Sequence, residues 1–393
     1  MSGTRTERLY YTNAYQSAFS TTVTAIDGSR VYLAASAFYP TSGGQPNDLG
    51  FLGGVAVTDV VDEGERVAHV LAMAPGFAVG AAVEAQVDWQ RRFDYMQQHT
   101  GQHLLSAVFE DLFGARTVSV HFGDAMSTLD VDSDTLGAAR VVEAERRANA
   151  IVLENRAVLV TFEEAATAQG LRKATDRSGD IRIVNIEGVD RSACGGTHVR
   201  ATGEIGPIMI RRVEKQKKSS RVEFLCGWRT LARGRRDFES LSQIASSLSC
   251  GIDDVGGLIA AQTDRLHALE AEQRRTQEQL AEYRAAALYQ NAAPDAQGIR
   301  RLDERFESVE ELRLIAQAIS RKSGVVFAGR AESPPTVVFA TSEDSGINAG
   351  VHLKTLLASH GGRGGGAPRV AQGTLADPGA MTALVQELLS PLS

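Results

Sequence analysis

A chain of 393 residues, 43% of them hydrophobic, is too long for one ordinary domain and suffices for about two to four compact cores. Its formal net charge of −7 excludes a general nucleic-acid coat but permits a local basic patch. Three cysteines, an odd and sparse set, favour a reducing compartment over a disulfide framework. The sequence shows no secretory signal and no membrane-spanning run, so we expect a cytoplasmic protein.

The first half of the chain changes from strand patterns to helix patterns and back. Residues 9–87 hold short β-rich runs, such as VYLAA and VAVTDVV, between glycine-rich turns. From Arg92 the apolar residues recur at helical spacing, and Gly114 is a suitable end for that helix. A second helix is predicted over residues 136–155, and IRIVNIEG, PIMIRRVE and SRVEFLCG predict strands.

The second half begins with a long helical stretch. Residues 238–289 are nearly free of proline and carry apolar positions at steps of three and four around the charged run DRLHALEAEQRRTQEQLAEYR. This pattern predicts a long exposed helix or a helical hairpin, with a coiled coil as one form it could take. NAAPDAQG ends the helix, after which VVFAG and TVVFATS predict buried strands.

Two pairs of residues have metal-ligand spacing. His99 and His103 lie four apart on the predicted helix, so both imidazoles face the same side about one turn apart. Such a pair is also typical of hydrogen-bonded core histidines. Cys194 and His198, in SACGGTHV, repeat the spacing around two glycines that allow a tight turn. Together the four residues supply the three nitrogens and one sulfur of a tetrahedral zinc site.

These motifs resemble a known family. HTGQHLL followed by CGGTHV resembles the editing domain of alanyl-tRNA synthetases and of their freestanding relatives, the AlaX proteins, more closely than the threonyl synthetase domain. FYPTSGGQPNDLG resembles the glycine-rich motif of that family's N-terminal β-barrel, and SVHFGDAMSTLD resembles the strand lining its editing pocket. SGINAGVHLKTLLASHGGRGGGAPRVAQG resembles the DHH-associated domain that ends the synthetases and the long AlaX proteins.

The resemblance implies an α+β protein in four parts. These are a β-barrel with the glycine-rich motif (1–91), a zinc-dependent editing domain (92–230), a long helical linker (231–296) and a C-terminal α/β, DHH-associated RNA-binding domain (297–393). Nothing in the sequence precedes the barrel, so we expect no aminoacylation domain and no tRNA charging. Dimerisation through the helical linker or the C-terminal domain is a further expectation.

The implied activity is trans-editing, the hydrolysis of alanine tRNA that carries serine or glycine. Binding alone separates these amino acids from alanine by only about 1–3 kcal/mol, which a second, hydrolytic site can correct. The resemblance places His121 at the substrate, as a contact for the ester or the terminal ribose, although a histidine facing solvent from a strand edge fits equally. Whether zinc activates water or shapes the pocket is left open, because four protein ligands resemble a closed structural site.

Two basic segments are candidates for binding tRNA. RRVEKQKKSSR holds six basic residues and one acidic residue, close in sequence to the second half of the zinc site. Its candidates are Arg211, Arg212, Lys215, Lys217, Lys218 and Arg221, although such a run is also typical of a solvated hairpin tip. In the C-terminal part, the glycines of GGRGGG allow backbone amides to approach phosphate, with Lys354 and Arg363 supplying charge.

Two other functions stay open at the level of sequence. One is a zinc hydrolase of another acylated substrate. A peptidase is disfavoured, because Thr100 stands where common metalloproteases carry glutamate after the first histidine. The other is a non-catalytic, zinc-containing tRNA-binding protein.

Overall fold

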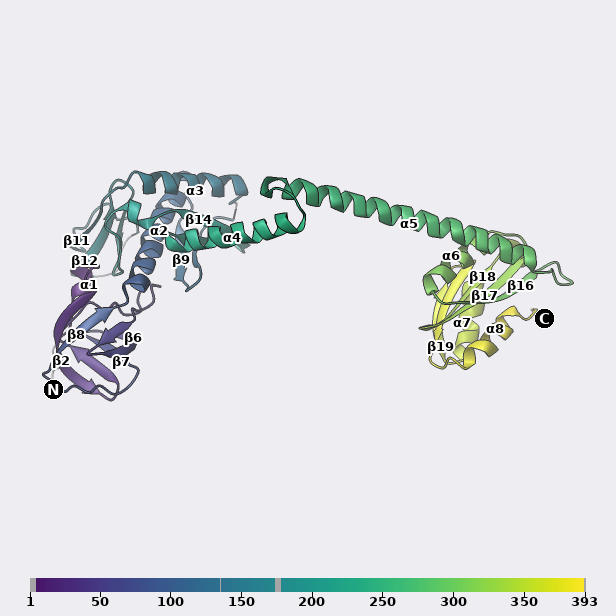
Figure 1. Cartoon of the computed structure of the whole chain (residues 1–393), viewed down its shortest axis with the longest axis horizontal. Coiled ribbons are helices and arrows are strands. Elements are labelled where there is room, and N and C mark those ends of the chain that lie inside the picture. The colour runs from purple at the N-terminus through teal and green to yellow at the C-terminus, as the bar shows by residue number, and fades with distance from the viewer. Residues whose placement is uncertain (1–4, 135, 174–177, 392–393) are drawn as a thin grey trace. The chain divides into compact units, whose positions relative to one another are not determined.

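The computed structural model describes residues 5–134, 136–173 and 178–391 (Figure 1). The chain divides into two compact units, Met1–Ile244 and Ala245–Ser393, which are described separately below. Among the described residues, eight α-helices occur together with several sheets. The expected mixed α+β class is therefore confirmed.

Six strands near the N-terminus close into a barrel in the order β2-β3-β7-β6-β5-β8. Alternate residues of β2 and β8 are buried, which is the pattern of strands with one face toward a core. Before and beside the barrel, β1 (Glu7–Arg8) pairs in parallel with β4 (Ala35–Ser36), and α1 spans Leu9–Thr12. The barrel strands are β2 (Ala18–Asp27), β3 (Arg30–Leu33), β5 (Gly50–Leu52), β6 (Val55–Glu63), β7 (Arg66–Leu71) and β8 (Ala82–Val87).

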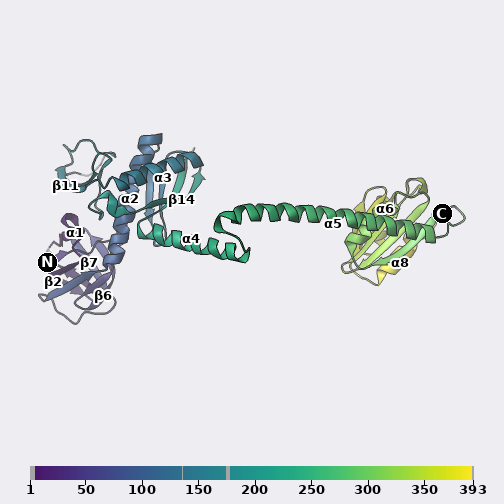
Figure 2. The same cartoon turned by 45° about the horizontal axis from the view of Figure 1, so that its top comes forward.

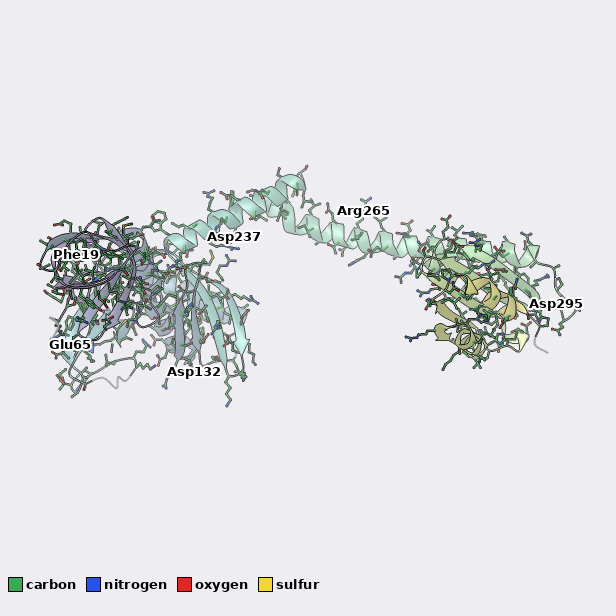
Figure 3. The ribbon with its side chains drawn as sticks, turned by 90° about the horizontal axis from the view of Figure 1, so that it is seen from below. Phe19, Glu65, Asp132, Asp237, Arg265 and Asp295 are labelled. Carbon is green, nitrogen blue, oxygen red and sulfur yellow. The ribbon has the colours of Figure 1, made fainter. Side chains whose placement is uncertain are left out.

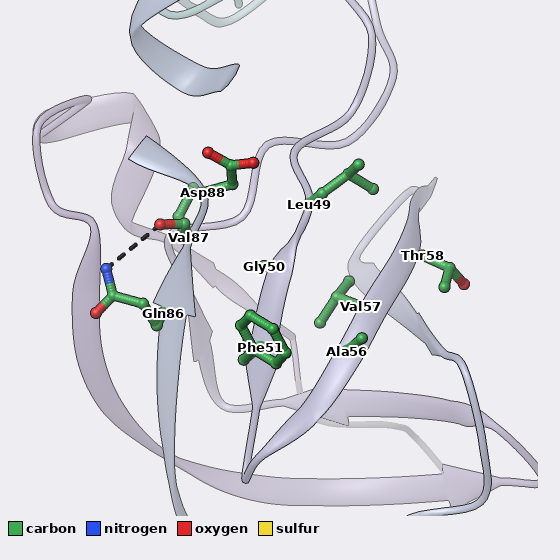
Figure 4. Close-up of a pocket in the computed structure, with 9 residues that line it drawn as sticks. All are labelled: Leu49, Gly50, Phe51, Ala56, Val57, Thr58, Gln86, Val87 and Asp88. Atoms are coloured by element: carbon green, nitrogen blue, oxygen red, sulfur yellow. Dashed lines mark hydrogen bonds between the residues drawn. The ribbon is translucent and has the colours of Figure 1, made fainter. Parts of the chain in front are cut away.

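A groove of about 600 Å³ lies on the barrel, beside β5 (Figure 4). Its lining is mainly apolar, and Phe51 is half exposed within it. None of the four predicted metal ligands is among the residues that line it, which are Leu49, Gly50, Phe51, Ala56, Val57, Thr58, Gln86, Val87 and Asp88. This groove is therefore separate from the site described below.

The helix α2 (Trp89–Phe113) leads from the barrel into the second half of this unit, where it packs against α3 (Ala138–Leu153) (Figure 2). The Asp88 side chain caps its N-terminus by accepting from the Arg91 N–H, and the helix ends at Gly114 with a φ of 67°. Its middle section, from Tyr95 to Phe109, is buried without interruption. Side chains on every face of this section are therefore held by neighbouring elements.

A buried arginine fixes α2 to the barrel. Arg92 is fully buried and forms an ion pair with Asp48, with Nε 3.0 Å from Oδ1. The same guanidinium donates to the carbonyls of Ala14 and Ala37, so its charge and most of its donors are satisfied. Asp48 belongs to the motif TSGGQPND, so this contact also sets the position of that glycine-rich loop relative to α2.

Two sheets complete the first unit. One has the order β14-β15-β10-β9 and the other the order β11-β12-β13. Their core includes buried residues of α2 and α3, which pack against the strands. The strands are β9 (Thr117–Phe122), β10 (Ser127–Val131), β11 (Val158–Glu164), β12 (Asp180–Ile186), β13 (Asp190–Ala193), β14 (Ile208–Gln216) and β15 (Ser219–Cys226), with a 3₁₀ turn over Thr202–Ile205.

Two helices follow β15 instead of one. α4 (Trp228–Ser247) ends before a 3₁₀ turn at Ile252–Asp254, and α5 spans Val255–Asn291. Side chains along the middle of α5, such as that of Arg265, are exposed and project away from the helix (Figure 3). Among the described residues no single helix is long and apolar enough to cross a membrane, and these two pass that test only when taken together.

The second unit is a five-stranded sheet with helices on both faces, in the order β16-β17-β18-β20-β19. The end of α5 and α6 pack on one face, and α7 and α8 pack on the other. The elements are β16 (Arg300–Phe306), α6 (Val309–Ile319), β17 (Val325–Glu332), β18 (Pro335–Thr341), a 3₁₀ turn (Glu343–Ser345), α7 (Ala349–Ser359), β19 (Gly362–Gly366), β20 (Val370–Leu375) and α8 (Ala380–Leu389).

Candidate metal centre

The structure brings the four predicted ligands together. His99 and His103 stand one turn apart on α2, with ring centroids 5.3 Å from each other. Cys194 and His198 come from the segment after β13. One ligand atom from each of the four residues lies within 4.8 Å of those of the other three, and the three histidines are buried.

Two of the separations between these atoms match those of a tetrahedral metal site. Cys194 Sγ lies 3.4 Å from the Nε2 atoms of both His99 and His198. Zinc bonded to nitrogen at about 2.0–2.1 Å and to sulfur at about 2.3 Å places these atoms about 3.5 Å apart in a tetrahedron. The donor set and its spacing therefore suit one metal ion.

Gly196 allows the cysteine segment to approach α2. A Cβ added at Gly196 would lie 2.2 Å from Cε1 of His99, so no larger residue fits without displacing that ligand. Arg182 on β12 holds the start of the segment, because its backbone carbonyl accepts from the Cys194 N–H and its guanidinium donates to the Cys194 carbonyl at 2.7 Å. The spacing of Cys194 and His198 thus depends on close backbone packing.

Each histidine is oriented by a second residue through Nδ1. His99 Nδ1 lies 2.8 Å from Gln45 Oε1, and His103 Nδ1 lies 2.8 Å from Asp190 Oδ2. His198 Nδ1 lies 3.1 Å from the Thr100 hydroxyl, which itself donates to the Met96 carbonyl. Amide and carboxylate oxygens only accept, so Nδ1 carries the proton in His99 and His103 and Nε2 is left to face the metal.

Sequence reasoning assigned no role to Gln45 or Asp190. Gln45 stands in the glycine-rich motif TSGGQP, and it also donates to Thr197 Oγ1 and accepts from the Thr197 N–H. It therefore joins the barrel to both halves of the metal site. Asp190 is held by the Arg172 guanidinium, whose Nε lies 2.9 Å from Oδ1. Its position four residues before Cys194 was the only signal in the sequence.

Charges within the cluster favour metal-binding protonation states at Cys194 and His198. Burial acts to raise the pKa of the Cys194 thiol, but the charges of His99 and His198 and the hydrogen bonds of His103 and His198 outweigh it and hold that pKa well below its usual value. Burial, together with the neighbouring His99, lowers the pKa of His198 to about 3. A thiolate and a neutral imidazole are the forms that bind a metal ion. At His103, by contrast, burial acts to lower the pKa, but the hydrogen bonds and charges of Asp190 and Cys194 raise it to about 10.

A cavity of about 770 Å³ opens beside His103. Its wall includes Ser106, which accepts hydrogen bonds from Gln102 Nε2 at 2.8 Å and from the Thr117 hydroxyl at 2.6 Å. The lining combines such hydroxyl groups with three cationic residues: it consists of Gly43, Gln102, His103, Ser106, Glu110, Arg116, Thr117, Val118, Ser119, Val120, Arg172, Lys173, Asp190, Ser192 and Ala193. A polar, partly cationic cavity therefore adjoins one ligand of the cluster.

His121 is placed differently from the ligands. It lies on β9 next to Phe122, whose ring packs 5.0 Å from that of His99. Phe122 is buried whereas His121 is exposed, as alternation along a strand requires. Among the described residues, His121 is not one of those that line the cavity beside His103.

The predicted RNA-binding residues are divided between the two units. Six of them are on the β14–β15 hairpin, and four of these form ion pairs: Arg211 with Asp237, Arg212 with Glu214, Lys215 with Asp134 and Arg221 with Asp130. Lys217 and Lys218 are exposed at the turn. Lys354 on α7 and Arg363 on β19 are exposed in the second unit.

Comparisons with known proteins agree with this arrangement. The family model for the threonyl and alanyl tRNA synthetase second additional domain matches residues 181–223, which include Cys194 and His198. The model for the DHHA1 domain matches residues 304–392. The fold and the site thus define a protein of the synthetase additional-domain class.

Sequence identities to individual proteins define the family more closely. Alanyl-tRNA editing protein Aarsd1 of Mus musculus is 32% identical over 308 residues, which cover 77% of this chain and 74% of that protein. The Bos taurus protein of the same name is 35% identical over 235 residues, 58% of this chain and 52% of that protein. Alanine–tRNA ligase of Pyrococcus abyssi is 30% identical over 397 residues, 95% of this chain but 42% of that enzyme. The chain belongs to the alanyl-tRNA editing protein family.

Proposed function

We propose that this protein is a zinc-dependent trans-editing hydrolase that deacylates alanine tRNA carrying serine or glycine. The observation that carries the proposal is the buried cluster of His99, His103, Cys194 and His198 beside a polar cavity. The family relationship supports the same reaction, because its named members are alanyl-tRNA editing proteins. The cytoplasm, where charged tRNA is used, is the expected location.

In the proposed reaction, the metal ligands and the residues that orient them have separate roles. His103 is both a ligand and part of the cavity wall, so a substrate in the cavity lies next to the metal. Zinc bound there would supply a fixed positive charge that polarises a substrate oxygen or lowers the pKa of a water. Asp190 and Gln45 hold the proton on Nδ1 of their histidines and so keep Nε2 directed at the metal.

The cavity wall supports a preference for serine over alanine. Ser106 and Thr117 carry two hydroxyl protons, of which only one is used in the bond between them. A serine hydroxyl in the cavity would accept the other, whereas the methyl group of alanine would leave it unpaired. His121 lies outside the cavity, so its proposed contact is with the terminal ribose and not with the ester.

Binding of tRNA is proposed for the basic residues of both units. On the hairpin, Lys217 and Lys218 have no ion-pair partner among the described residues, so their charge is available to phosphate. Lys354 and Arg363 are proposed to contact RNA from the DHH-associated part. We retain the four-part organisation proposed from sequence, and a homodimer through the helical segment or the C-terminal part.

The test is a deacylation assay with three purified substrates. Alanine tRNA charged with serine, glycine or alanine is incubated with the protein, with a chelator, and with chelator followed by zinc. We expect hydrolysis of the serine or glycine form, sparing of the alanine form, loss with chelator and recovery with zinc. Tight tRNA binding without hydrolysis would support a non-catalytic role instead, and equal hydrolysis of all three forms would contradict editing.

A further inference from the structure

A cleft of about 480 Å³ lies between α4 and the strands near Asp124 and the β14–β15 hairpin. Arg229, Arg233 and Arg236 are spaced by four and three residues, so they lie on one face of α4. The lining contains five arginines against two carboxylates: it consists of Asp124, Ala125, Met126, Arg211, Arg212, Glu223, Leu225, Arg229, Ala232, Arg233 and Arg236. The chain as a whole is acidic, so this concentration of guanidinium groups is a local feature.

Two of these arginines have complete structural roles. Arg229 binds both oxygens of the Asp94 carboxylate, with its shortest contact at 2.6 Å, and donates to the Gly123 carbonyl. Arg212 lies 2.6 Å from Glu214 and opposite Glu223 in the strand register. Asp124 accepts from the Tyr95 hydroxyl at 2.7 Å. Asp124 thus has a hydrogen-bond partner, and Glu223 is a carboxylate in the cleft wall.

The other three arginines lack enough acceptors. Arg211 and Arg233 share one carboxylate, that of Asp237, at 3.3 and 2.7 Å. Among the described residues, the buried Nε of Arg233 has no hydrogen-bond partner. Within the described part of the chain, the one hydrogen bond of the Arg236 guanidinium is a 3.5 Å contact to the Ala232 carbonyl. In the ranges that the structure describes, the ion pairs of these three guanidinium groups involve one carboxylate, that of Asp237, and Glu223 also lines the cleft. A buried N–H without an acceptor is unfavourable unless a ligand supplies one.

A series of contacts links the wall of the cleft to the metal centre. Arg229 donates to the carbonyl of Gly123, the residue after Phe122, and the Phe122 ring packs on His99. The Arg229 guanidinium also lies 5.2 Å from the ring centroid of Tyr95, which is one turn before His99 on α2. An RNA strand whose acylated 3′ end enters the cavity at His103 would therefore bring its nearby phosphates within reach of this face of α4.

We propose that Arg211, Arg233 and Arg236 bind phosphates of the RNA backbone close to the acylated 3′ end. The inference rests on the proposed function and locates substrate binding on α4, which the sequence did not indicate. Guanidinium groups suit this ligand because they donate in a planar fork that matches phosphate oxygens. Phosphate would supply the acceptors that Arg233 and Arg236 lack.

The experiment compares two substrates that differ in their phosphates. Arg233→Gln/Arg236→Gln is assayed on serine-charged alanine tRNA and on 3′-seryl adenosine, which carries the ester but no phosphate. We expect KM for the tRNA to rise about tenfold or more, since one contact to a charged group is worth that factor. The salt dependence of tRNA binding should weaken by about 0.7 in slope for each phosphate that the variant no longer binds. Hydrolysis of seryl adenosine and zinc content should stay unchanged.

Two further variants distinguish a loss of phosphate binding from a loss of folding or of total charge. Arg236→Gln alone removes a guanidinium without an ion pair among the described residues, so it should fold normally and still raise KM for the tRNA. Arg30→Gln/Arg66→Gln on the barrel removes the same charge elsewhere and should leave KM unchanged. The proposal is overturned if the α4 variants match this control or slow both substrates equally. If the unmodified protein hydrolyses neither substrate, the proposed function fails, and binding of uncharged tRNA to the same variants still tests the cleft.

Discussion

The metal centre and the basic hairpin were both predicted from short motifs, but the structure surrounds them very differently. The four ligands are gathered in the interior, and each histidine has a further partner that orients it. On the hairpin, four of six cationic side chains instead pair with acidic residues at the surface. The spacing of a motif thus predicts a site well when its side chains must meet at one point, as metal ligands do. It predicts a basic surface poorly, because ion pairs with nearby acidic residues determine which cations remain free to bind phosphate.

The sharpest test of this contrast replaces one ligand and one unrelated cysteine. Cys194→Ala removes the only thiolate of the cluster and should abolish both stoichiometric zinc binding and deacylation. The loss of zinc affinity should exceed the roughly 10–100-fold typical of residues that only support a ligand. Cys250→Ala is the matched control, since Cys250 is a free cysteine outside the cluster. Zinc content is measured by elemental analysis, and full occupancy in the Cys194 variant contradicts the assignment.

The buried residue His69 offers a second test of the difference between buried and exposed groups, and it involves no metal ligand. His69 is fully buried in the barrel, with Nε2 2.7 Å from the Ser36 hydroxyl and Nδ1 3.0 Å from the Val31 carbonyl. Burial lowers its pKa from 6.5 to about 4. Between these values the unfolded chain binds a proton that the folded chain does not, so stability is complete above pH 6.5 and falls as the pH drops toward 4. The loss amounts to about 3 kcal/mol.

Denaturant unfolding at pH 7.5, 5.5 and 4.5 measures this dependence. Both tryptophans, Trp89 and Trp228, belong to the first unit, so their fluorescence reports on it. In the presence of chelator, His69→Gln should show a shallower loss of stability with acid than the unmodified protein. His267→Gln, at an exposed position on α5, should retain the original dependence. Parallel pH curves for all three proteins would exclude His69 as the cause.

Replacing Asp190, which orients His103, should lower the zinc affinity less than replacing a ligand does. It should lower that affinity more than replacing a partner in an exposed ion pair does. Asp190→Asn keeps the shape of the side chain and removes the charge that faces both His103 and Arg172. Zinc affinity, measured by competition with a chelator, should fall by about tenfold. Asp111→Asn removes another, more exposed partner of Arg172 and serves as the control. Equal affinities in the two variants would show that Asp190 does not tune the site.

Much of the fold was predictable from local patterns. The helix expected from Arg92 to Gly114 is α2, which begins three residues earlier at Trp89 and ends at that glycine. VVFAG and TVVFATS lie in β17 and β18 as predicted. For the stretch 238–289 the sequence predicts either one long helix or a helical hairpin. The structure breaks it between α4 and α5, where Ser249 has a φ of 53° and Gly251 follows.

The surroundings of the site were not predictable, because they depend on tertiary packing. Gln45 and His99 are 54 residues apart, and they meet only because the barrel docks on α2 through the Arg92–Asp48 ion pair. Asp190 lies 87 residues from His103, so no local pattern connects the two. Likewise three of the four acidic partners on the basic hairpin come from outside it, namely from β10, from the segment after β10 and from α4. Hydrophobic periodicity describes one helix or strand at a time, and it gives no information on contacts between residues that are distant in sequence.

The smallest expected effect is on tRNA binding, and it distinguishes unpaired from ion-paired cations on the hairpin. Lys217 and Lys218 are exposed and have no ion-pair partner among the residues the structure describes, whereas Arg221 binds both oxygens of Asp130 at 2.8 and 2.9 Å. Lys217→Ala/Lys218→Ala should weaken tRNA binding a few-fold and reduce its salt slope, because each phosphate contact releases counterions.

Arg221→Gln is the matched comparison for this pair. Asp130 already holds the Arg221 guanidinium, so Arg221 is expected to make no phosphate contact and the salt slope should stay close to that of the unmodified protein. The affinity for tRNA should fall less than in the double lysine variant. Both quantities come from titrations at several salt concentrations. If Arg221→Gln changes the slope as much as the double lysine variant, ion pairing does not withdraw a cation from RNA binding. The charge of the hairpin as a whole would then matter more than the partner of any one residue.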